Sequence, residues 1–511
     1  MSQSPQAAPS VSTGIEGLDH ILGGGFTPNR LYLLEGEPGS GKTTMGLQFL
    51  LAGVQAGETV LYVTLSETRD ELLETAASHG WSLDGIHIHE LLPMGDQLDP
   101  ESQYTMFHPS EVELGETTGR MLQEVERLQP TRVVFDSLAE IRLMAGTMLR
   151  FRRQVLALKQ YFAGRDTTVL LLDDANGVEQ GAPVHTIVHG AVMLSQMRPD
   201  YGGDRRRLRI SKLRGRPFIG GFHDYEIRTG GIELFPRLIA SHFRRDGTVE
   251  QINSNLPGLD ALLGGGLDRG TSTLITGAAG TGKSSVAVLF AHAAVERGET
   301  ATLFLFDESL RTLLARMGSL GVDLQPHLDA GRLVVHQVDP AEWSPGEFSN
   351  AVRTAVDDHK SAVVVIDSLN GYLHSMPNER FLIIQLHEVL TYLGQQGVAT
   401  ILINAQIGLV GQMKSEIDAS YLADSVVLTR YFELDGEVRM AISVVKKRGS
   451  HHERFIRELL MRDGKIWIGE PLRGYHGVLT GVPVRISGSG DQPATPPAQP
   501  GPAVRSKPHG P

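Results

Sequence analysis

The feature that most constrains this 511-residue chain is a glycine-rich sequence that occurs twice. GEPGSGKTT covers residues 36–44, and GAAGTGKSS covers residues 277–285, an offset of 241 residues. The same offset holds without a gap from residue 11 to residue 68, and the triplet DSL at 136–138 recurs at 367–369. Because a period of this length is too long for a solenoid, we expect two homologous domains from a tandem duplication.

The repeat predicts the domain boundaries. We expect a flexible N-terminus at 1–10, a first domain at 11–245 and a second domain at 246–486. Residues 487–511 are rich in Pro, Gly, Ser and Gln and hold few large apolar side chains. Such a segment cannot offset the entropy of becoming ordered, so we predict a disordered tail.

The hydrophobic pattern indicates an α/β fold in each copy. Short β-branched runs such as VLYVTL (60–65) and ATILINA (399–405) alternate with amphipathic stretches of helical length. Continuous apolar strands are typical of mostly parallel sheets that helices cover on both faces.

Composition narrows the functional classes. Lys and Arg total 47 against 59 Asp and Glu, a formal charge of -12, which argues against a protein that mainly coats nucleic acid. There is no cysteine, which excludes disulfides and thiolate metal sites and fits a reducing compartment. The N-terminus is polar, and no run of 18 apolar residues occurs. We therefore predict a cytoplasmic protein without a membrane span.

Both glycine-rich sequences match G-x-x-x-x-G-K-[ST], each between a predicted strand and a predicted helix. In such a loop the backbone N–H groups converge on phosphate oxygens, the lysine neutralises the β- and γ-phosphates, and the hydroxyl binds Mg²⁺. A chance glycine-rich turn is the alternative for one bare motif, but two copies in register favour a nucleoside triphosphate, ATP, at each. The predicted binding residues are Gly36, Gly39, Ser40, Gly41, Lys42, Thr43 and Thr44, and Gly277, Gly280, Thr281, Gly282, Lys283, Ser284 and Ser285.

A metal-side carboxylate is expected at the tip of a neighbouring strand. Asp136 and Asp367 end the apolar runs VVF and VVI, and we predict that they hold Mg²⁺ together with the hydroxyls of Thr43 and Ser284. The alternative is that each Asp only caps the helix that follows.

A glutamate at the end of the strand after the loop helix predicts a residue that activates the nucleophile. Glu67 and Glu308 stand there in the two copies, with a solvated strand-end carboxylate as the alternative. Asp307 precedes Glu308, whereas Ser66 precedes Glu67, so the two sites are chemically unequal.

A basic K-x-R pattern ends a late strand in each copy, at Lys212 and Arg214 and at Lys446 and Arg448. Side chains two apart on a strand share a face. We predict that they reach the γ-phosphate bound by a neighbouring subunit and stabilise transition-state charge. A nucleic-acid patch or a solvated edge strand remains the alternative, because seven basic residues lie between 205 and 216.

Taken together, the two P-loops, GLDHILGGG and GLDALLGGG, the strand-end glutamates, DSL and the K-x-RG tips resemble the KaiC family of RecA-like ATPases over roughly residues 11–485. This resemblance implies a double-doughnut hexamer with ATP at subunit interfaces, an ATPase first domain and a second domain that also phosphorylates itself. It makes Lys212, Arg214, Lys446 and Arg448 the groups offered to the neighbour's ATP.

The resemblance also points to a phosphoacceptor. IDASYLADS places Ser420 at the family's phosphorylated serine and Tyr421 at its threonine, and we expect Tyr421 to be a packing aromatic. The family usually has adjacent glutamates at the strand end. Asp307 with Glu308 keeps both charges and favours phosphotransfer in the second domain, whereas Ser66 argues against hydrolysis in the first.

Partners and rival functions follow from the same features. The Pro-rich tail cannot form the acidic helix that a clock activator grips, so the predicted bacterial partner is a sensor kinase or a small KaiB-like protein. One rival is a RecA- or RadA-like DNA-dependent ATPase; residues 409–425 are more acidic than basic, which counts against it. Another is an ATP-stabilised ring scaffold without turnover. We interpret His451, His452 and Glu453 as a solvated cluster rather than a metal site.

Overall fold

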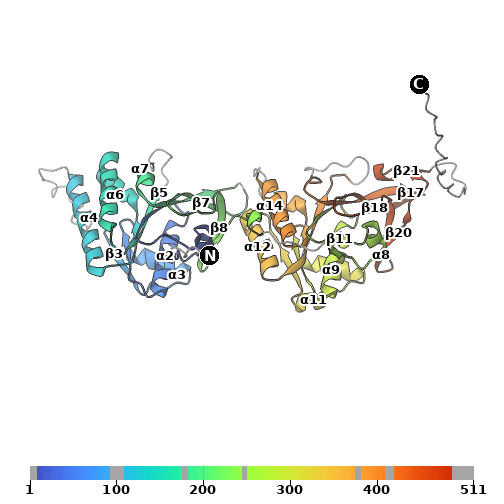
Figure 1. Ribbon diagram of the computed structural model, residues 1–511, viewed down its shortest axis with the longest axis horizontal. Helices are drawn as coiled ribbons and strands as arrows, with labels where there is room; N and C mark the ends of the chain where they lie inside the picture. The colour runs from blue at the N-terminus through green and yellow to red at the C-terminus, as the bar shows by residue number, and fades with distance from the viewer. Residues whose placement is uncertain are drawn as a thin grey trace, which may run out of the picture.

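The structure is a computed structural model that describes residues 9–91, 109–174, 182–199, 201–243, 250–374, 381–408 and 419–485. Two similar α/β domains follow one another along its long axis (Figure 1). The predicted flexible N-terminus, apart from residues 9 and 10, and the predicted tail lie outside the described residues.

The first domain is built on a nine-stranded sheet with strand order β3-β2-β4-β5-β1-β6-β7-β8-β9. The six strands from β3 to β6 are parallel, and β7, β8 and β9 add antiparallel strands beyond β6. Its elements are α1 (Glu16–Ile21), β1 (Leu31–Gly36), α2 (Lys42–Gln55), β2 (Val60–Thr64), α3 (Arg69–Ser78), β3 (Ile86–Glu90), α4 (Pro109–Leu128), β4 (Arg132–Asp136), α5 (Leu138–Ala145), α6 (Met148–Phe162), β5 (Thr168–Asp174), α7 (Ala182–Ile187), β6 (Gly190–Met197), β7 (Arg205–Leu213), β8 (Phe222–Arg228), β9 (Gly231–Phe235) and the 3₁₀ helix η3 (Ala240–Phe243).

The second domain repeats this sheet in the order β14-β13-β15-β16-β12-β17-β18-β19-β20. The duplication predicted from the sequence is therefore confirmed at the level of topology. Its elements are β10 (Gln251–Ile252), α8 (Pro257–Leu262), β11 (Leu267–Asp268), β12 (Ser272–Gly277), α9 (Lys283–Glu296), β13 (Thr300–Leu305), α10 (Leu310–Ser319), α11 (Gln325–Asp329), β14 (Leu333–Gln337), α12 (Pro345–Asp357), β15 (Ser361–Asp367), α13 (Leu369–His374), α14 (Leu382–Gln395), β16 (Ala399–Ala405), β17 (Ser425–Leu434), β18 (Glu437–Lys447), β19 (Arg457–Arg462), β20 (Lys465–Pro471), β21 (Tyr475–His476), η4 (Val478–Thr480) and β22 (Val484–Arg485).

The buried faces of the sheets explain the continuous apolar strands. All six residues of β1 are buried. Leu34 packs in the cluster that contains Phe49 of α2, and Leu33 packs in the cluster that contains Phe151 of α6. Because successive side chains point to opposite faces, a strand covered on both sides is apolar along most of its length.

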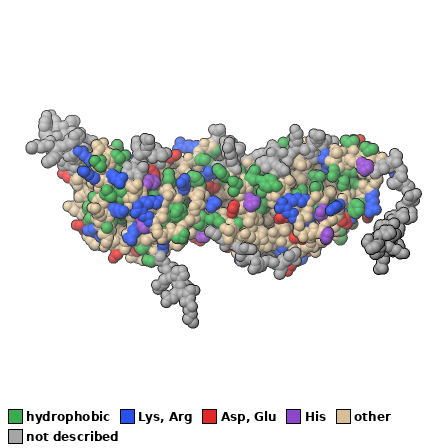
Figure 2. Space-filling view, turned by 45° about the horizontal axis from the view of Figure 1, so that its top comes forward, with side chains coloured by type: hydrophobic (Ala, Val, Ile, Leu, Met, Phe, Trp, Pro, Cys, Tyr) green, Lys and Arg blue, Asp and Glu red, His purple; other side chains and the backbone are tan. Residues whose placement is uncertain are grey.

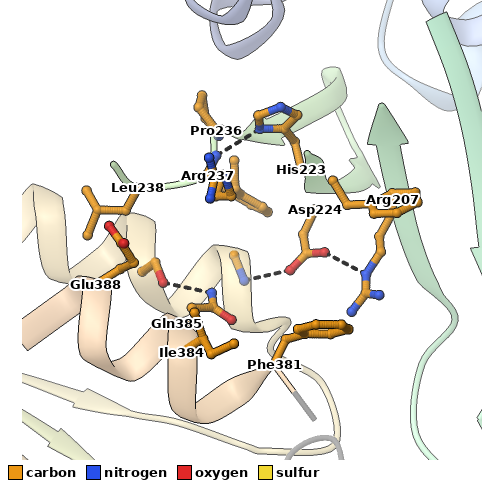
Figure 3. Close-up of a pocket in the computed structure, with 14 residues that line it drawn as sticks. Arg207, His223, Asp224, Pro236, Arg237, Leu238, Phe381, Ile384, Gln385 and Glu388 are labelled. Carbon is orange, nitrogen blue, oxygen red and sulfur yellow. Dashed lines mark hydrogen bonds and ion pairs between the residues drawn. The ribbon is translucent and has the colours of Figure 1, made fainter. Parts of the chain in front are cut away.

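The two domains are joined by polar contacts between the edge of the first sheet and the start of α12. Arg205 is buried and donates to the carbonyl oxygens of Glu342, Ala341 and Pro340 at 2.6, 2.8 and 3.0 Å. Asp224 of β8 accepts from the backbone N–H of Gly346 at 2.7 Å, as Figure 3 shows.

A cavity of about 380 Å³ lies at this junction, between the end of the first sheet and α14. Figure 3 shows Asp224 pointing toward the guanidinium of Arg207 on one side of it, with Phe381 and Ile384 on the other. Although the repeat predicts a boundary at 245, Leu238 and Ala240 already pack in the hydrophobic cluster of the second domain.

No helix among the described residues is long and apolar enough to span a membrane. On the face shown in Figure 2, Lys and Arg side chains lie in separate patches on both domains, interspersed with acidic and hydrophobic side chains. That face therefore lacks the continuous basic stripe that a DNA-coating surface needs.

Candidate nucleotide sites

The first glycine-rich loop lies at the carboxyl end of β1, between β5 and β6 in the centre of the sheet. Gly41 has φ 91°, and a Cβ added there would stand 2.8 Å from Cδ1 of Ile227, so the loop requires glycine at this position. A hydrogen bond also holds the loop in place, because the Tyr225 hydroxyl donates to the carbonyl oxygen of Ser40 at 2.6 Å.

The lysine of the first loop is buried and already has partners. Lys42 Nζ donates to the carbonyl oxygens of Gly36 and Glu37 at 2.9 and 3.1 Å, and it lies 2.9 Å from Oδ1 of Asp174. Asp174 ends β5, the strand next to β1. A phosphate that enters the loop therefore competes with this carboxylate for the ammonium group.

The lysine of the second loop lacks that ion pair. Lys283 Nζ donates to the carbonyl oxygen of Ala278 at 2.6 Å, and Ala405 occupies the strand-end position that Asp174 holds in the first domain. Burial lowers the pKa of Lys283 to about 8, against an opposing effect of the Asp367 charge. Bound phosphate would favour the charged ammonium and raise this pKa again.

The predicted hydroxyl–carboxylate pairs come together in both domains. Thr43 Oγ1 donates to Asp136 Oδ2 at 3.2 Å, and the Tyr62 hydroxyl donates to the same oxygen at 2.5 Å. Burial raises the pKa of the Asp136 carboxyl, while these hydrogen bonds lower it. Asp367 is alike: burial raises its pKa, and a hydrogen bond with Ser284 opposes the rise. A cation at either site would relieve the cost of a buried carboxylate.

Glu67 lies beside the first pair and has an unsatisfied oxygen. Its Oε2 is buried and has no hydrogen-bond partner among the described residues. Burial raises the pKa of Glu67, and the charges of Asp136 and Glu71 raise it further, against Lys42. A carboxylate with a raised pKa and a free acceptor is suited to take a proton from water.

Glu308 occupies the matching position but is paired. Arg316 of α10 donates from Nε to Oε1 at 3.0 Å and from Nη2 to Oε2 at 2.7 Å. Thr75 occupies the corresponding position of α3 in the first domain. Asp307 also has a partner, because the Ser368 hydroxyl donates to its Oδ2. The sequence favoured the second site for chemistry, whereas the structure leaves Glu67 the more available of the two glutamates.

In each domain the K-x-R pair lies at the amino ends of the parallel strands, whereas the glycine-rich loop lies at their carboxyl ends. Lys212 is paired with Ala191 near the start of β6, and the backbone N–H of Arg214 bonds to the carbonyl of His189, which precedes β6. The N–H of His189 in turn bonds to Leu31, the first residue of β1, whereas the glycine-rich loop follows its last residue. At about 3.3 Å per residue, β1 separates the two ends by about 17 Å.

The second domain has the same arrangement. The backbone of Arg448 bonds to Asp424, which bonds to Ser272 at the start of β12. In both domains the lysine holds carbonyl groups of its own chain: Lys212 Nζ donates to Val188 at 2.9 Å, and Lys446 Nζ donates to Ser420 and Ala423 at 2.8 and 2.7 Å. The structure therefore does not bring either basic pair to the loop of its own domain.

Ser420, the expected phosphoacceptor, lies at that same edge in a half-buried turn just before β17. Its carbonyl accepts from Lys446, so the serine and the basic tip are neighbours. Tyr421 is 55% exposed, and the expectation that it packs as an aromatic is wrong within the single chain.

Three residues of the sites were missed from the sequence: Tyr62, Asp174 and Arg316. Asp174 left a signal, since the strand TVLLLDD ends in two acids and its counterpart ATILINA ends in none. Arg316 left none, because only the packing of α10 brings it to Glu308. Both carboxylate oxygens of Glu453, which follows His451 and His452, accept hydrogen bonds from Arg457.

Two mostly parallel sheets, each with a glycine-rich loop at the carboxyl end of its central strand, define a tandem P-loop protein with RecA-like domains. The family model of the KaiC ATPase matches residues 11–239 and 252–473, and the chain belongs to this family.

Curated relatives agree over nearly the whole length. The circadian clock oscillator protein KaiC of Thermostichus vulcanus is 28% identical over 494 residues, which cover 95% of this chain and 94% of the relative. Those of Prochlorococcus marinus and Synechococcus elongatus are each 28% identical over 489 and 491 residues, covering 93% and 94% of this chain and 96% and 93% of the relatives.

Proposed function

We propose that this chain is a Mg-ATP hydrolase whose subunits form a closed ring, a hexamer, with each nucleotide between the loop of one subunit and the K-x-R tip of the next. The position of the tips carries the proposal. Arg214 and Arg448 lie at the sheet edge remote from their own loops, so they serve a nucleotide only if it is bound by another subunit.

In the first site, Lys42 would leave Asp174 for the β- and γ-phosphates, while Thr43 and Asp136 would hold Mg²⁺. Mg²⁺ held by these residues would supply positive charge that offsets the charge of the phosphates. Glu67 orients water and accepts its proton, because its Oε2 has no hydrogen-bond partner among the described residues. The guanidinium of Arg214 from the neighbour stabilises the charge that develops on the γ-phosphoryl group.

In the second site, Lys283, Ser284 and Asp367 take the matching roles, with Asp307 and Glu308 at the γ-phosphate. We propose phosphotransfer to Ser420 of the adjacent subunit, because Ser420 lies beside the basic tip Lys446. The serine oxygen bonds to the γ-phosphorus, the bond to the β-phosphate oxygen breaks, ADP leaves, and an acidic side chain takes the serine proton. A cytoplasmic location and a sensor-kinase or KaiB-like partner stay predictions from the sequence.

Complementation tests the shared first site. All chains carry Lys283→Ala, which silences the second site. Chains with Lys42→Ala lack a working first loop, chains with Arg214→Ala lack the first basic tip, and the two kinds of chain are mixed. Each variant alone should release phosphate at a small fraction of the parent rate. Mixed rings should regain turnover, because some interfaces then join an intact loop to an intact tip.

Two outcomes would count against the proposal: no gain on mixing, although both variants assemble with Mg-ATP, or full activity of Arg214→Ala alone. Phosphotransfer is tested separately with γ-labelled ATP and peptide mapping. Label should appear on Ser420 and be absent from Ser420→Ala, and an unlabelled chain with normal phosphate release would leave only the hydrolase.

A further inference from the structure

A group of two histidines and one glutamate lies in the second domain, at the end of α9 away from the glycine-rich loop. His292 and Glu296 are one turn apart on α9 and therefore share a face of the helix. His327 comes from α11 and is 7% exposed at its side chain. One potential ligand atom from each residue lies within 4.8 Å of the other two.

The three side chains converge on one oxygen. Nε2 of His327 is 2.8 Å from Oε1 of Glu296, and Nε2 of His292 is 3.9 Å from the same atom. The two imidazole rings are 5.5 Å apart and roughly perpendicular. A tetrahedral Zn²⁺ with bonds of about 2.0 to 2.2 Å separates its ligand atoms by about 3.3 to 3.6 Å. Small side-chain rotations would bring these atoms to that spacing.

The charges at the site suit a cation. Glu296 brings a carboxylate to the site, beside the imidazoles of His292 and His327. The carboxyl end of α9 adds the negative end of the helix dipole. A water would complete four ligands.

The first domain offers a natural comparison that lacks all three groups. α2 and α9 align without a gap, and Leu51 and Gln55 stand where α9 has His292 and Glu296. The segment between α10 and β14 is six residues longer than that between α3 and β3, and the extra length includes α11 with His327. The complete group therefore occurs only in the second domain, where His327 comes from the longer segment and His292 and Glu296 are substitutions on the shared helix.

We propose that His292, Glu296 and His327 form a site for a divalent transition ion of the Zn²⁺ class, which fastens α11 to α9. Two imidazoles and one carboxylate bind Zn²⁺ in preference to Mg²⁺, since imidazole suits the softer ion. The site is separate from the nucleotide sites, because twelve residues of α9 lie between Lys283 and Glu296.

The test uses the full chain, freed of metals with a chelator and then saturated with Mg-ATP. Titration with Co²⁺ should add one strongly coloured ion per chain, because tetrahedral nitrogen and oxygen ligands intensify its visible absorption. Zn²⁺ should displace it and raise the unfolding temperature. The variants His292→Leu and Glu296→Gln copy the first domain, so α9 should tolerate them, yet each should weaken Zn²⁺ binding by roughly 100-fold.

The control is His451→Ala combined with His452→Ala, which removes the other histidine pair of this domain and should leave Co²⁺ uptake unchanged. Nucleotide binding by each variant reports whether the domain still folds. The proposal is overturned if the parent chain takes up no coloured Co²⁺, or if His292→Leu and Glu296→Gln, folded and binding nucleotide, take up the ion as the parent does.

Discussion

Arg316 donates hydrogen bonds to both carboxylate oxygens of Glu308, whereas Glu67, its counterpart in the first domain, keeps one buried oxygen without a hydrogen-bond partner in the described structure. The difference depends on one position, because Thr75 stands in the first domain where Arg316 stands in the second. The two glutamates therefore differ in their readiness to accept a proton.

Exchanging these residues should exchange the activities. Arg316→Thr frees Glu308 and should raise phosphate release at the second site by about tenfold, while Thr75→Arg should lower release at the first site by a similar factor, less than the roughly 100-fold or more that a general base supplies in full. Each rate is measured with the other loop silenced, by Lys42→Ala or Lys283→Ala. Equal rates before and after the exchange would show that Arg316 leaves Glu308 when nucleotide binds.

Removing the carboxylate beside the first lysine should strengthen nucleotide binding. Asp174→Ala leaves Lys42 without its ion pair, so the phosphate no longer has to displace a carboxylate from the lysine. The change also removes a negative charge near the phosphates. Since Asp174 is about one-third exposed, we expect a gain of only about 1 kcal/mol, a several-fold lower dissociation constant for ATP. Titration with a fluorescent nucleotide in the Lys283→Ala background measures it, with the surface change Asp84→Ala as control. Weaker binding would assign Asp174 a direct role in holding the ligand.

Acid should loosen the edge of the first sheet through His223. Its ring is buried, Nε2 pairs with the carbonyl of Ile219 at 3.0 Å, and Nδ1 accepts from the backbone N–H of Arg237 at 2.9 Å. Burial lowers the pKa of His223 to about 4, so the fold favours the neutral ring. Its contribution is present above about pH 6.5 and is lost as pH falls from there toward 4.

Between pH 7 and pH 5 this group should cost about 2 kcal/mol of the free energy of unfolding. His223→Gln keeps one donor and one acceptor without the titration, so its unfolding midpoints at the two pH values should differ by less than those of the parent. Urea unfolding measures both chains. An identical pH dependence would mean that His223 is protonated without cost.

Loss of Arg205 should uncouple the domains. Arg205→Ala deletes three hydrogen bonds to the segment 340–342, and we expect the contact to weaken by about 3 kcal/mol. In calorimetry the two domains should then unfold in more widely separated transitions. Arg228→Ala removes the ion pair between Arg228 and Glu347. Because the Arg228 side chain is about half exposed, this change should weaken the contact between the domains by about 1 kcal/mol or less. Similar effects of the two variants would contradict this ranking.

The sequence was most informative where function depends on short segments. Lys42, Thr43 and Asp136 could be placed because a glycine-rich loop joins a strand to a helix, and a strand-end Asp meets it at the carboxyl ends of the strands, although the structure places β5 between β4 and β1. The duplication supplied an internal control for each motif, and the doubled sheet order follows from it.

Contacts between distant segments could not be predicted in the same way. The pairing of Arg316 with Glu308 depends on how α10 packs after its turn, and Lys42 meets Asp174 across 132 positions of sequence. Likewise, the sequence of α11 does not reveal that its histidine lies beside α9. Side-chain partners of this kind depend on tertiary packing, which no local pattern encodes.

Tyr225 and Asp224 are consecutive residues of β8, and so they face opposite sides of the sheet. Tyr225 holds the carbonyl of Ser40 in the first loop, and Asp224 holds the first turn of α12 in the second domain. A single rigid peptide unit thus spans the distance between a phosphate cradle and the neighbouring domain. A twist of β8 that moves the first glycine-rich loop therefore also moves α12, so this strand links the nucleotide loop of the first domain to the second domain.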